Sequence, residues 1–332
     1  MVLKEIGREG QSRLGESCAV VVGVGALGSV SSNLLARAGV GRLKIIDRDY
    51  VEIENLQRQV LFDETDLKEN LPKAAAAKRK LEKINSEIKV EALVGDLNPH
   101  TAEECLADAD VIIDGTDNFE TRFLINDFCL KRKTPWIYGG AIRTEGMSFV
   151  VIPGDGPCLR CLFGEAPNPE SVQTCDQVGI LAPVAHLIAS FQTIEAIKIL
   201  AGHHEALERQ LWKVDLWSRE FKAISVDHLK NNPCTGCQGK DFPYLENRKM
   251  TRTVALCGRN AVQILREGKV QLNFSELASK LSKQGKVEYN DYLLKYSMQP
   301  YEITVFTNGR AIIRGTEDEH QAKSLYAKYI GA

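Results

Sequence analysis

The sequence predicts an α/β protein, namely a doubly wound, Rossmann-like sheet with an antiparallel extension, followed by a small C-terminal α+β domain. Three observations predict this class. An apolar run breaks into glycines and then into a helical pattern, strands and helices alternate as far as residue 141, and short strands with a helix follow residue 251. A chain of 332 residues is long enough for about two domains, which we place at residues 1–245 and 250–332.

The first strand and helix belong to the stretch "AVVVGVGALGSVSSNLLARAGV". Its apolar start is typical of a buried parallel strand, and the apolar positions after the glycines have helical spacing. Gly23, Gly25 and Gly28 form a G-x-G-x-x-G turn, which lets backbone N–H groups approach a phosphate at a helix N-terminus. The next strand, "RLKIID", ends at Asp47, where a carboxylate can bind ribose hydroxyls. This pattern fits NAD, ATP or a glycine turn without a ligand.

Alternating elements continue the sheet. The pattern predicts three helix–strand pairs, at residues 72–84 and 88–94, 101–106 and 110–116, and 119–131 and 135–141. That order implies a parallel sheet that binds ligands at the carboxyl ends of its strands. Later segments predict strands that extend the sheet in antiparallel fashion around one long helix, at residues 147–153, 180–202 (the helix), 211–217 and 220–226.

The C-terminal region has its own organisation. Residues 231–250 are polar and loop-like, and residues 251–332 alternate short strands with a helix. The dipeptide Asn308-Gly309 between apolar segments favours a tight hairpin. We expect this region to be a small accessory module that docks a partner, dimerises or stabilises the chain.

Composition limits the classes of partner. With 44 acidic and 42 basic residues, the chain has no net attraction for nucleic acid or for an anionic membrane. The polar N-terminus lacks the apolar region of a secretory signal. The most apolar stretch, "ILAPVAHLIASFQTIEAIKILAG", contains His186, Gln192, Glu195 and Lys198, which favour a buried helix over a membrane span. We therefore expect a cytoplasmic protein that acts on a small or locally complementary ligand.

Two cysteine pairs indicate a metal site. "CLRC" contains Cys158 and Cys161, and "CTGC" contains Cys234 and Cys237, so each pair places two thiolates on one tight turn. Four thiolates complete a closed tetrahedral zinc site, which here would join two distant loops. The alternatives are two incidental pairs or a redox-active pair, although neither pair begins a helix after a strand as in thioredoxin-like motifs.

Polar residues beyond Asp47 favour a nucleoside triphosphate over a dinucleotide. Asn55 and Arg58, with Gln57 between them, follow the ribose-binding acid, and Lys73 begins a helix after a proline. Such cations neutralise phosphates as pyrophosphate departs. Asp117 follows the next strand and offers a hard oxygen ligand for magnesium. Taken singly, the cations fit solvated surface charges, and Asp117 fits the cap of the following helix.

These segments together resemble one protein family. The stretches "VVVGVGALGS", "DRDYVEIENLQRQ", "PKA", "DGTDNFETR", "GGAIRTEG" and "TCDQVGILAPV", with the two cysteine pairs, are similar to the ThiF/MoeB/HesA family from about residue 7 to residue 239. Members of this family are relatives of ubiquitin-activating enzymes. The resemblance implies ATP-dependent adenylation, with magnesium, of the C-terminal glycine of a small β-grasp, ubiquitin-like sulfur-carrier protein that ends in Gly-Gly.

The resemblance also implies roles for single residues. The glycines would lie under the nucleotide, Asp47 would hold the ribose, and Asn55, Arg58 and Lys73 would contact the phosphates. Asp117 would organise magnesium, and the four paired cysteines would be structural zinc ligands. Further implied properties are a homodimer, a sulfur donor such as a cysteine desulfurase, and a place in thiamine, molybdopterin or related synthesis.

The remaining cysteines need separate assignments. Cys175 lies in a polar loop before the long helix and matches the position where some relatives join covalently to the activated carrier; an inert loop thiol is the alternative. We expect Cys18, Cys105 and Cys129 to be small core residues because they fall in strand or helix patterns. Cys257 stays unassigned.

The chain departs from its relatives at two places. Many relatives carry an N-terminal arginine that reaches the neighbouring subunit's ATP site, and neither Arg8 nor Arg13 matches it. Asn70 stands where relatives have glycine, a mild change because asparagine tolerates left-handed backbone. The alternatives to an adenylating enzyme are an NAD-dependent Rossmann oxidoreductase and a non-catalytic, nucleotide-binding scaffold of the same fold.

Overall fold

The chain divides into two compact units, Met1–Lys249 and Met250–Ala332. A computed structural model describes residues 3–167, 175–249, 254–256, 260–264 and 272–331.

An eight-stranded sheet forms the centre of the first unit, in the order β3-β2-β1-β4-β5-β6-β7-β8. The strands from β3 to β5 are parallel and those from β5 to β8 are antiparallel, which confirms the predicted doubly wound sheet with an antiparallel extension. The strands are β1 (Cys18–Val22), β2 (Arg42–Asp47), β3 (Lys89–Val94), β4 (Val111–Asp114), β5 (Trp136–Ile142), β6 (Glu145–Val151), β7 (Leu211–Asp215) and β8 (Glu220–Ile224).

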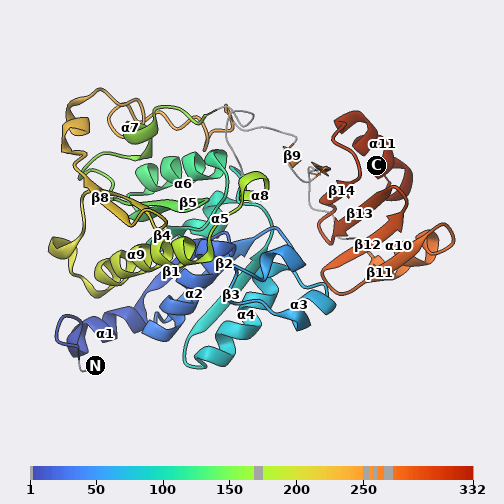
Figure 1. Cartoon of the computed structure of the whole chain (residues 1–332), viewed down its shortest axis with the longest axis horizontal. Helices are drawn as coiled ribbons and strands as arrows, with labels where there is room; N and C mark the ends of the chain where they lie inside the picture. Colours follow the sequence, from blue (N-terminus) through green and yellow to red (C-terminus); the bar gives the residue numbers. More distant parts are fainter. Residues whose placement is uncertain (1–2, 168–174, 250–253, 257–259, 265–271, 332) are drawn as a thin grey trace. The chain divides into compact units, whose positions relative to one another are not determined.

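Helices cover both faces of this sheet. Figure 1 shows α6 on one side and α2, α4 and α9 on the other. The helices are α1 (Gly7–Glu16), α2 (Ala26–Ala38), α3 (Glu64–Lys68), α4 (Lys73–Ile84), α5 (Ala102–Leu106), α6 (Phe119–Arg132), α7 (Leu159–Phe163), α8 (Cys175–Val178) and α9 (Ala182–Ala201), with 3-10 turns at η1 (Ile53–Asn55), η3 (His204–Ala206) and η4 (Asp227–Asn231).

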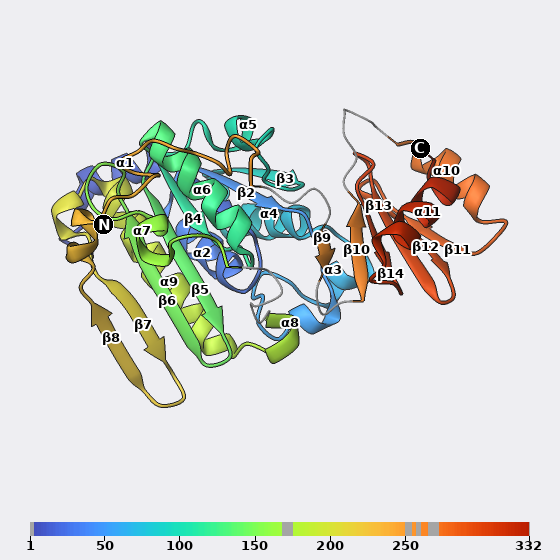
Figure 2. The same cartoon turned by 90° about the horizontal axis from the view of Figure 1, so that it is seen from above.

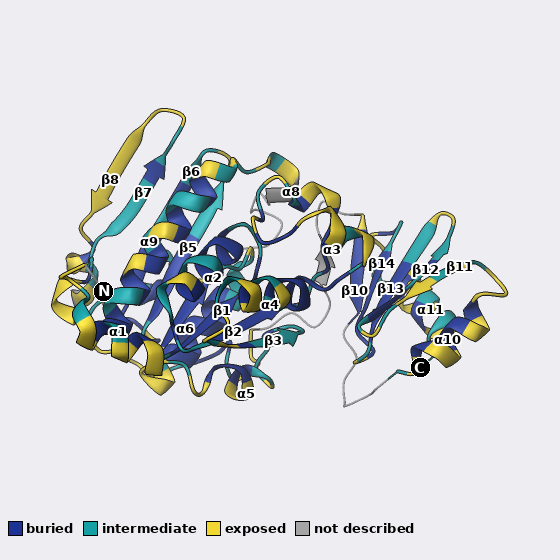
Figure 3. Ribbon diagram, turned by 90° about the horizontal axis from the view of Figure 1, so that it is seen from below, coloured by how far each residue is buried: buried dark blue, intermediate teal, exposed yellow. Residues whose placement is uncertain are grey.

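The central strands are buried on both faces, which explains why their sequences are continuously apolar. All five residues of β1 are buried. Figure 3 shows that β8, in contrast, is exposed along its length, because it lies at the edge of the sheet and pairs only with β7. Helix α1 was not predicted, since its polar sequence buries only Gly10 and Leu14.

Helix α9 is the predicted long apolar helix. It packs against α2 and against β5 and β6. Its residues Val184, Ala185 and Ile188 are fully buried, and they form one apolar cluster with Leu27 and Val30 of α2. Within the described part of the chain, α9 is the one helix whose length and hydropathy would suit a membrane span, and 61% of that window is buried. This burial agrees with the predicted core helix.

The second unit contains a six-stranded antiparallel sheet in the order β11-β12-β13-β14-β10-β9. Figure 2 shows α10 and α11 on one side of it, where they share an apolar core with the sheet. Gly309, with φ +82°, lies in the turn between β13 and β14 and confirms the predicted hairpin. The elements are β9 (Val254–Leu256), β10 (Ala261–Ile264), α10 (Phe274–Leu281), β11 (Lys286–Tyr289), β12 (Leu293–Met298), β13 (Tyr301–Phe306), β14 (Ala311–Arg314) and α11 (Glu319–Tyr329).

Candidate nucleotide site and four-cysteine cluster

The glycine turn lies where β1 and β4 end, and the backbones of Gly23, Gly28 and Gly115 pack closely against one another. Gly23 has φ +84°, a left-handed conformation that favours glycine. A Cβ atom on Gly28 would lie 1.8 Å from the Gly23 carbonyl oxygen, and one on Gly115 would lie 2.4 Å from the same oxygen. Gly25 is less restricted, because the nearest atoms to an added Cβ are 3.9 Å away. The turn therefore requires glycine at 23 for its backbone conformation and at 28 for packing, while an added Cβ at Gly25 meets no close neighbour.

Asp47 joins the ends of β1 and β2. Its Oδ2 accepts a hydrogen bond from Val24 N at 2.6 Å, and its Oδ1 accepts one from Asp49 N at 2.7 Å. Burial raises the pKa of Asp47 above its ordinary value, while Lys73 acts in the opposite direction. Each carboxylate oxygen has a second lone pair, so this side chain can shape the turn and still accept a ribose hydroxyl.

Lys73 begins α4 and is almost completely buried, with 3% of its surface exposed. Its Nζ lies 3.6 Å from Asp49 Oδ2, and its backbone N–H donates to the Asp49 carbonyl. Arg48 pairs with Asp96 at 3.0 Å. Burial lowers the pKa of Arg48, but Asp96, Asp49 and Asp117 together raise it above its ordinary value, so the guanidinium stays charged. Two cations thus accompany Asp47 at the end of β2.

The segment after β2 carries the other predicted phosphate ligands. Asn55 is buried, and its Oδ1 accepts a hydrogen bond from Glu52 N at 3.3 Å, which directs the NH₂ group of the amide to other acceptors. Arg58 is half-buried and donates to the Glu54 carbonyl at 2.6 Å. Gln59, which the sequence analysis missed, is buried, and its Nε2 is the atom nearest to a Cβ added at Gly25. The Gln59 side chain therefore lies beside the glycine turn.

Asp117 is exposed in the loop between β4 and α6. The cap of α6 is Asn118, whose side chain accepts a hydrogen bond from Thr121 N at 2.9 Å. The interpretation of Asp117 as a helix cap is therefore wrong. The Asp117 carboxylate instead contributes to the negative potential around Arg48.

A buried ion pair that the sequence analysis missed supports this loop. Asp114, the last residue of β4, is fully buried, and its Oδ2 accepts a hydrogen bond from Arg122 Nε at 3.0 Å. Its Oδ1 accepts from Thr116 N and Oγ1 at 2.9 and 2.6 Å, and Arg122 also donates to the Thr116 carbonyl at 2.7 Å. Burial raises the pKa of Asp114, and Arg122 opposes that change. The pair fixes the backbone immediately before Asp117.

The structure brings the four paired cysteines together. Their sulfur atoms all lie within 4.8 Å of one another, with separations of 3.8 Å for Cys158–Cys161, 3.8 Å for Cys158–Cys234 and 3.6 Å for Cys161–Cys237. A tetrahedron with Zn–S bonds of about 2.3 Å has edges of about 3.8 Å, so the donor set fits zinc. Hydrogen bonding among the thiols lowers the pKa of Cys158 and raises the pKa values of Cys161 and Cys237. All four sulfurs would therefore be thiolates only with a cation to offset their charge.

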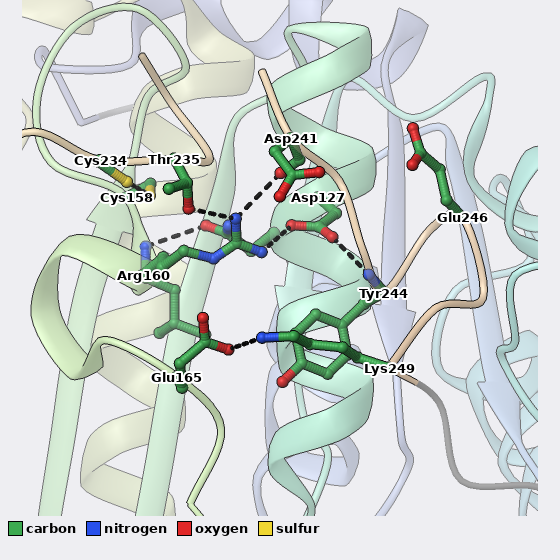
Figure 4. Close-up of polar contacts among 12 residues, drawn as sticks. Asp127, Cys158, Arg160, Glu165, Cys234, Thr235, Asp241, Tyr244, Glu246 and Lys249 are labelled. Atoms are coloured by element: carbon green, nitrogen blue, oxygen red, sulfur yellow. Dashed lines mark hydrogen bonds and ion pairs between the residues drawn. The ribbon is translucent and has the colours of Figure 1, made fainter. Parts of the chain in front are cut away.

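A second buried ion pair attaches this cluster to α6, as Figure 4 shows. Arg160, between the first two cysteines, donates to Asp127 Oδ1 at 3.0 Å and to the Asp241 carbonyl at 3.0 Å. Asp127 also accepts from Tyr244 N at 2.9 Å. Burial raises the pKa of Asp127 to about 6, although Arg160 lowers it. The Asp127 carboxylate on α6 therefore binds both chain segments that supply the cysteines, through Arg160 in one and Tyr244 just beyond the other.

The other cysteines are divided between core and undescribed parts of the chain. Cys18, Cys105 and Cys129 are buried, which confirms them as core residues. The backbone of Cys175 begins α8, but its side chain lies outside the described residues, as does all of Cys257. Asn70 has φ +50°, the left-handed conformation expected at that position.

The carboxyl ends of three neighbouring strands, β2, β1 and β4, thus carry Asp47, the glycine turn and the Asp117 loop. The sequence profile of the ThiF family matches residues 1–236. The chain belongs to the ThiF family.

Named relatives within the ThiF family agree with this assignment. The chain is 43% identical over 327 residues to the sulfur carrier protein ThiS adenylyltransferase of Bacillus subtilis, covering 98% of this chain and 96% of that one. It is 38% identical over 251 residues to the SAMP-activating enzyme E1 of Haloferax volcanii, covering 74% and 92%. Among solved structures, E. coli MccB with ATP has a TM-score of 0.57 and 25% identity over 66% of each chain.

Proposed function

We propose that this chain adenylates the C-terminal glycine of a small ubiquitin-like sulfur-carrier protein with ATP. The observation that carries the proposal is the convergence of the glycine turn, Asp47, Lys73 and Asp117 at the carboxyl ends of adjacent strands in a ThiF-family chain. The B. subtilis relative, which matches almost the full length of both chains, is named for the same reaction on ThiS. MccB, which shares the fold, has been solved with ATP.

The reaction needs positioning and charge stabilisation more than acid–base chemistry. A terminal carboxylate oxygen of the carrier attacks the α-phosphorus of ATP, the bond from that phosphorus to the bridging oxygen breaks, and pyrophosphate leaves with the electron pair. The carrier carboxylate is already ionised near neutral pH, so no general base is required. Asn55, Arg58 and Lys73 would hold the phosphates and Asp47 the ribose.

Magnesium and zinc would have separate roles. Magnesium, when bound, neutralises phosphate charge, and Asp117 is the carboxylate of the β4–α6 loop that is exposed to receive it, because Asp114 is occupied by Arg122 and Thr116. Zinc would be held by Cys158, Cys161, Cys234 and Cys237 as a closed, structural site that joins two loops.

Further proposals concern partners and setting. We propose a cytoplasmic homodimer that receives sulfur from a separate donor such as a cysteine desulfurase, in thiamine or molybdopterin synthesis. The unit formed by residues 250–332 would serve as an accessory module. Light scattering tests the dimer, which has twice the 36.9 kDa mass of one chain; a particle of single-chain mass contradicts it. A pull-down with tagged candidate carriers ending in Gly-Gly tests the partner.

The central experiment is the carrier-dependent exchange of labelled pyrophosphate into ATP. Asp117→Ala should abolish exchange while leaving the fold intact, because the loop that bears Asp117 is held by Asp114 and Arg122. Glu104→Ala, which removes an exposed acid from α5, is the matched control and should exchange normally. Near-normal exchange by folded Asp117→Ala would remove Asp117 from the site.

A second experiment separates activation from transfer. If Cys175 accepts the activated carrier, Cys175→Ala should form the carrier adenylate normally and fail only in transfer. Mass spectrometry of the wild-type chain with carrier, ATP and a sulfur donor should then show a linkage through Cys175. A phosphine reducing agent releases an acyl-disulfide, whereas a thioester resists it and yields to hydroxylamine or excess thiol. Full downstream transfer by the variant, with no linkage detected, would make Cys175 a simple loop thiol.

A further inference from the structure

Phe163, the last residue of α7, lies at the junction between the four-cysteine cluster and the candidate nucleotide site. Its ring meets the ring of Phe119 edge-on, with centroids 5.8 Å apart and an interplanar angle of 72°. It also meets the ring of Tyr138 edge-on, at 5.6 Å and 62°. Phe119 is the first residue of α6, just beyond Asp117, and Tyr138 belongs to β5. One half-buried ring therefore contacts two elements that border the Asp117 loop.

The two rings that Phe163 contacts also flank the guanidinium of Arg122. Its Cζ lies 5.1 Å from the Phe119 centroid and 5.3 Å from the Tyr138 centroid, within the range of a cation–π contact. Arg122 in turn holds the Asp114 carboxylate and the Thr116 carbonyl. A continuous series of contacts thus runs from Phe163 to the residue that precedes Asp117.

The other end of this series is fixed at the cysteine cluster. Helix α7 has only five residues, its N-cap is Cys158, and it contains Cys161. Arg160 attaches it to α6 through Asp127, which lies eight residues after Phe119 in the same helix. Because α7 is anchored at its first turn, the position of Phe163 relative to the start of α6 is determined by the cluster.

We propose that Phe163 is a positioning residue for the Asp117 carboxylate. The ring of Phe163 holds Phe119 and Tyr138 against Arg122, and Arg122 fixes the loop in the conformation that presents Asp117 to magnesium and the ATP phosphates. The inference rests on the proposed function, since it concerns the magnesium-dependent part of ATP binding. It assigns Phe163 no contact with the nucleotide.

Calorimetric titration of the full-length chain with ATP, with and without magnesium, tests the proposal. Phe163→Leu keeps an apolar side chain but removes both edge-on ring contacts, each of which contributes in the range of ring pairs. The gain in ATP affinity on adding magnesium should fall by about fivefold or more, while affinity without magnesium stays at the wild-type level. Phe163→Tyr, which keeps the ring, should show the wild-type gain in ATP affinity on adding magnesium.

Two further variants define the interpretation. Phe119→Leu removes the opposite ring of the same contact and should produce the same loss, which keeps the proposal testable if Phe163→Leu folds poorly. Phe191→Leu removes a comparable ring pair, with Trp212 at 5.6 Å, on α9 and should leave the magnesium gain unchanged. If the wild-type chain gains no affinity from magnesium, the proposed function fails. If the wild-type chain does gain affinity, and folded Phe163→Leu and Phe119→Leu show the same magnesium gain as the wild type, then the role of Phe163 is overturned while the proposed function stands.

Discussion

Asp114→Asn should destabilise the first unit strongly, because it removes one partner of a buried ion pair. Asp114 is fully buried and the Arg122 side chain is 9% exposed, so the variant leaves a guanidinium charge without its carboxylate in the core. Breaking such a pair lowers the free energy of unfolding by about 3–5 kcal/mol. Asparagine keeps the shape, and its Oδ1 can still accept the hydrogen bonds from Thr116, but its NH₂ group then faces Arg122 Nε and cannot accept, so the loss reports on the charge and on that hydrogen bond together. Arg122→Met added to Asp114→Asn should recover most of the loss, because no buried charge remains.

Urea unfolding followed by tryptophan fluorescence measures this effect selectively. All three tryptophans, Trp136, Trp212 and Trp217, lie in the first unit. Glu220→Gln, which breaks the exposed pair with Lys222 on β8, is the matched control and should cause no measurable change. A strong role for the buried charge is refuted if Asp114→Asn unfolds at the wild-type urea concentration, or if the double variant is no more stable than the single one.

Three other predictions follow from the same structure. The purified chain should hold about one zinc per molecule by elemental analysis, and Cys237→Ser should lower that content; a metal-free wild type prepared without chelator would contradict the cluster's role. The Asp127 carboxyl should titrate at about pH 6 by NMR, and a midpoint at the ordinary value would contradict this. Because folding raises its pKa from 3.8, its contribution to the free energy of unfolding should fall by about 3 kcal/mol as pH rises from about 4 to about 6. Gly28→Ala should lower the urea midpoint sharply while Gly25→Ala does not, given added Cβ atoms at 1.8 and 3.9 Å from their nearest neighbours; equal midpoints would contradict the packing of the turn.

The sequence was sufficient to predict which segments of the first unit form strands and that a parallel sheet continues into antiparallel strands. Parallel strands buried on both faces have continuous apolar runs, and the glycine turn marks where β1 passes into α2. The antiparallel extension was predicted from a change in pattern after residue 146. Helix α1 was missed because its segment, GREGQSRLGE, is polar, contains three glycines and has Leu14 as its one large apolar side chain. The strand order of the second sheet depends on long-range pairing, which short strands do not specify locally.

The candidate site was predictable where chemistry follows spacing and not where it depends on tertiary contacts. The two cysteine pairs predicted a four-sulfur cluster, and the structure brings those sulfurs together. Asp49 was overlooked although it stands two residues after Asp47, since its partner Lys73 becomes its neighbour only on folding. Asp114 and Arg122 lie within a segment whose more obvious acid, Asp117, is exposed. Buried polar partners of this kind are specified by the fold, and only a structure reveals them.

The mass of the carrier protein tests the central claim most directly. A small carrier ending in Gly-Gly, incubated with the chain, ATP and magnesium, should gain the mass of one adenylyl group at its C-terminus with release of one pyrophosphate. The same carrier without its terminal glycine should gain nothing, because the attacking carboxylate would lie one residue out of reach of the α-phosphorus. An unmodified carrier with unconsumed ATP, or equal modification of the truncated carrier, would contradict adenylation of the terminal glycine.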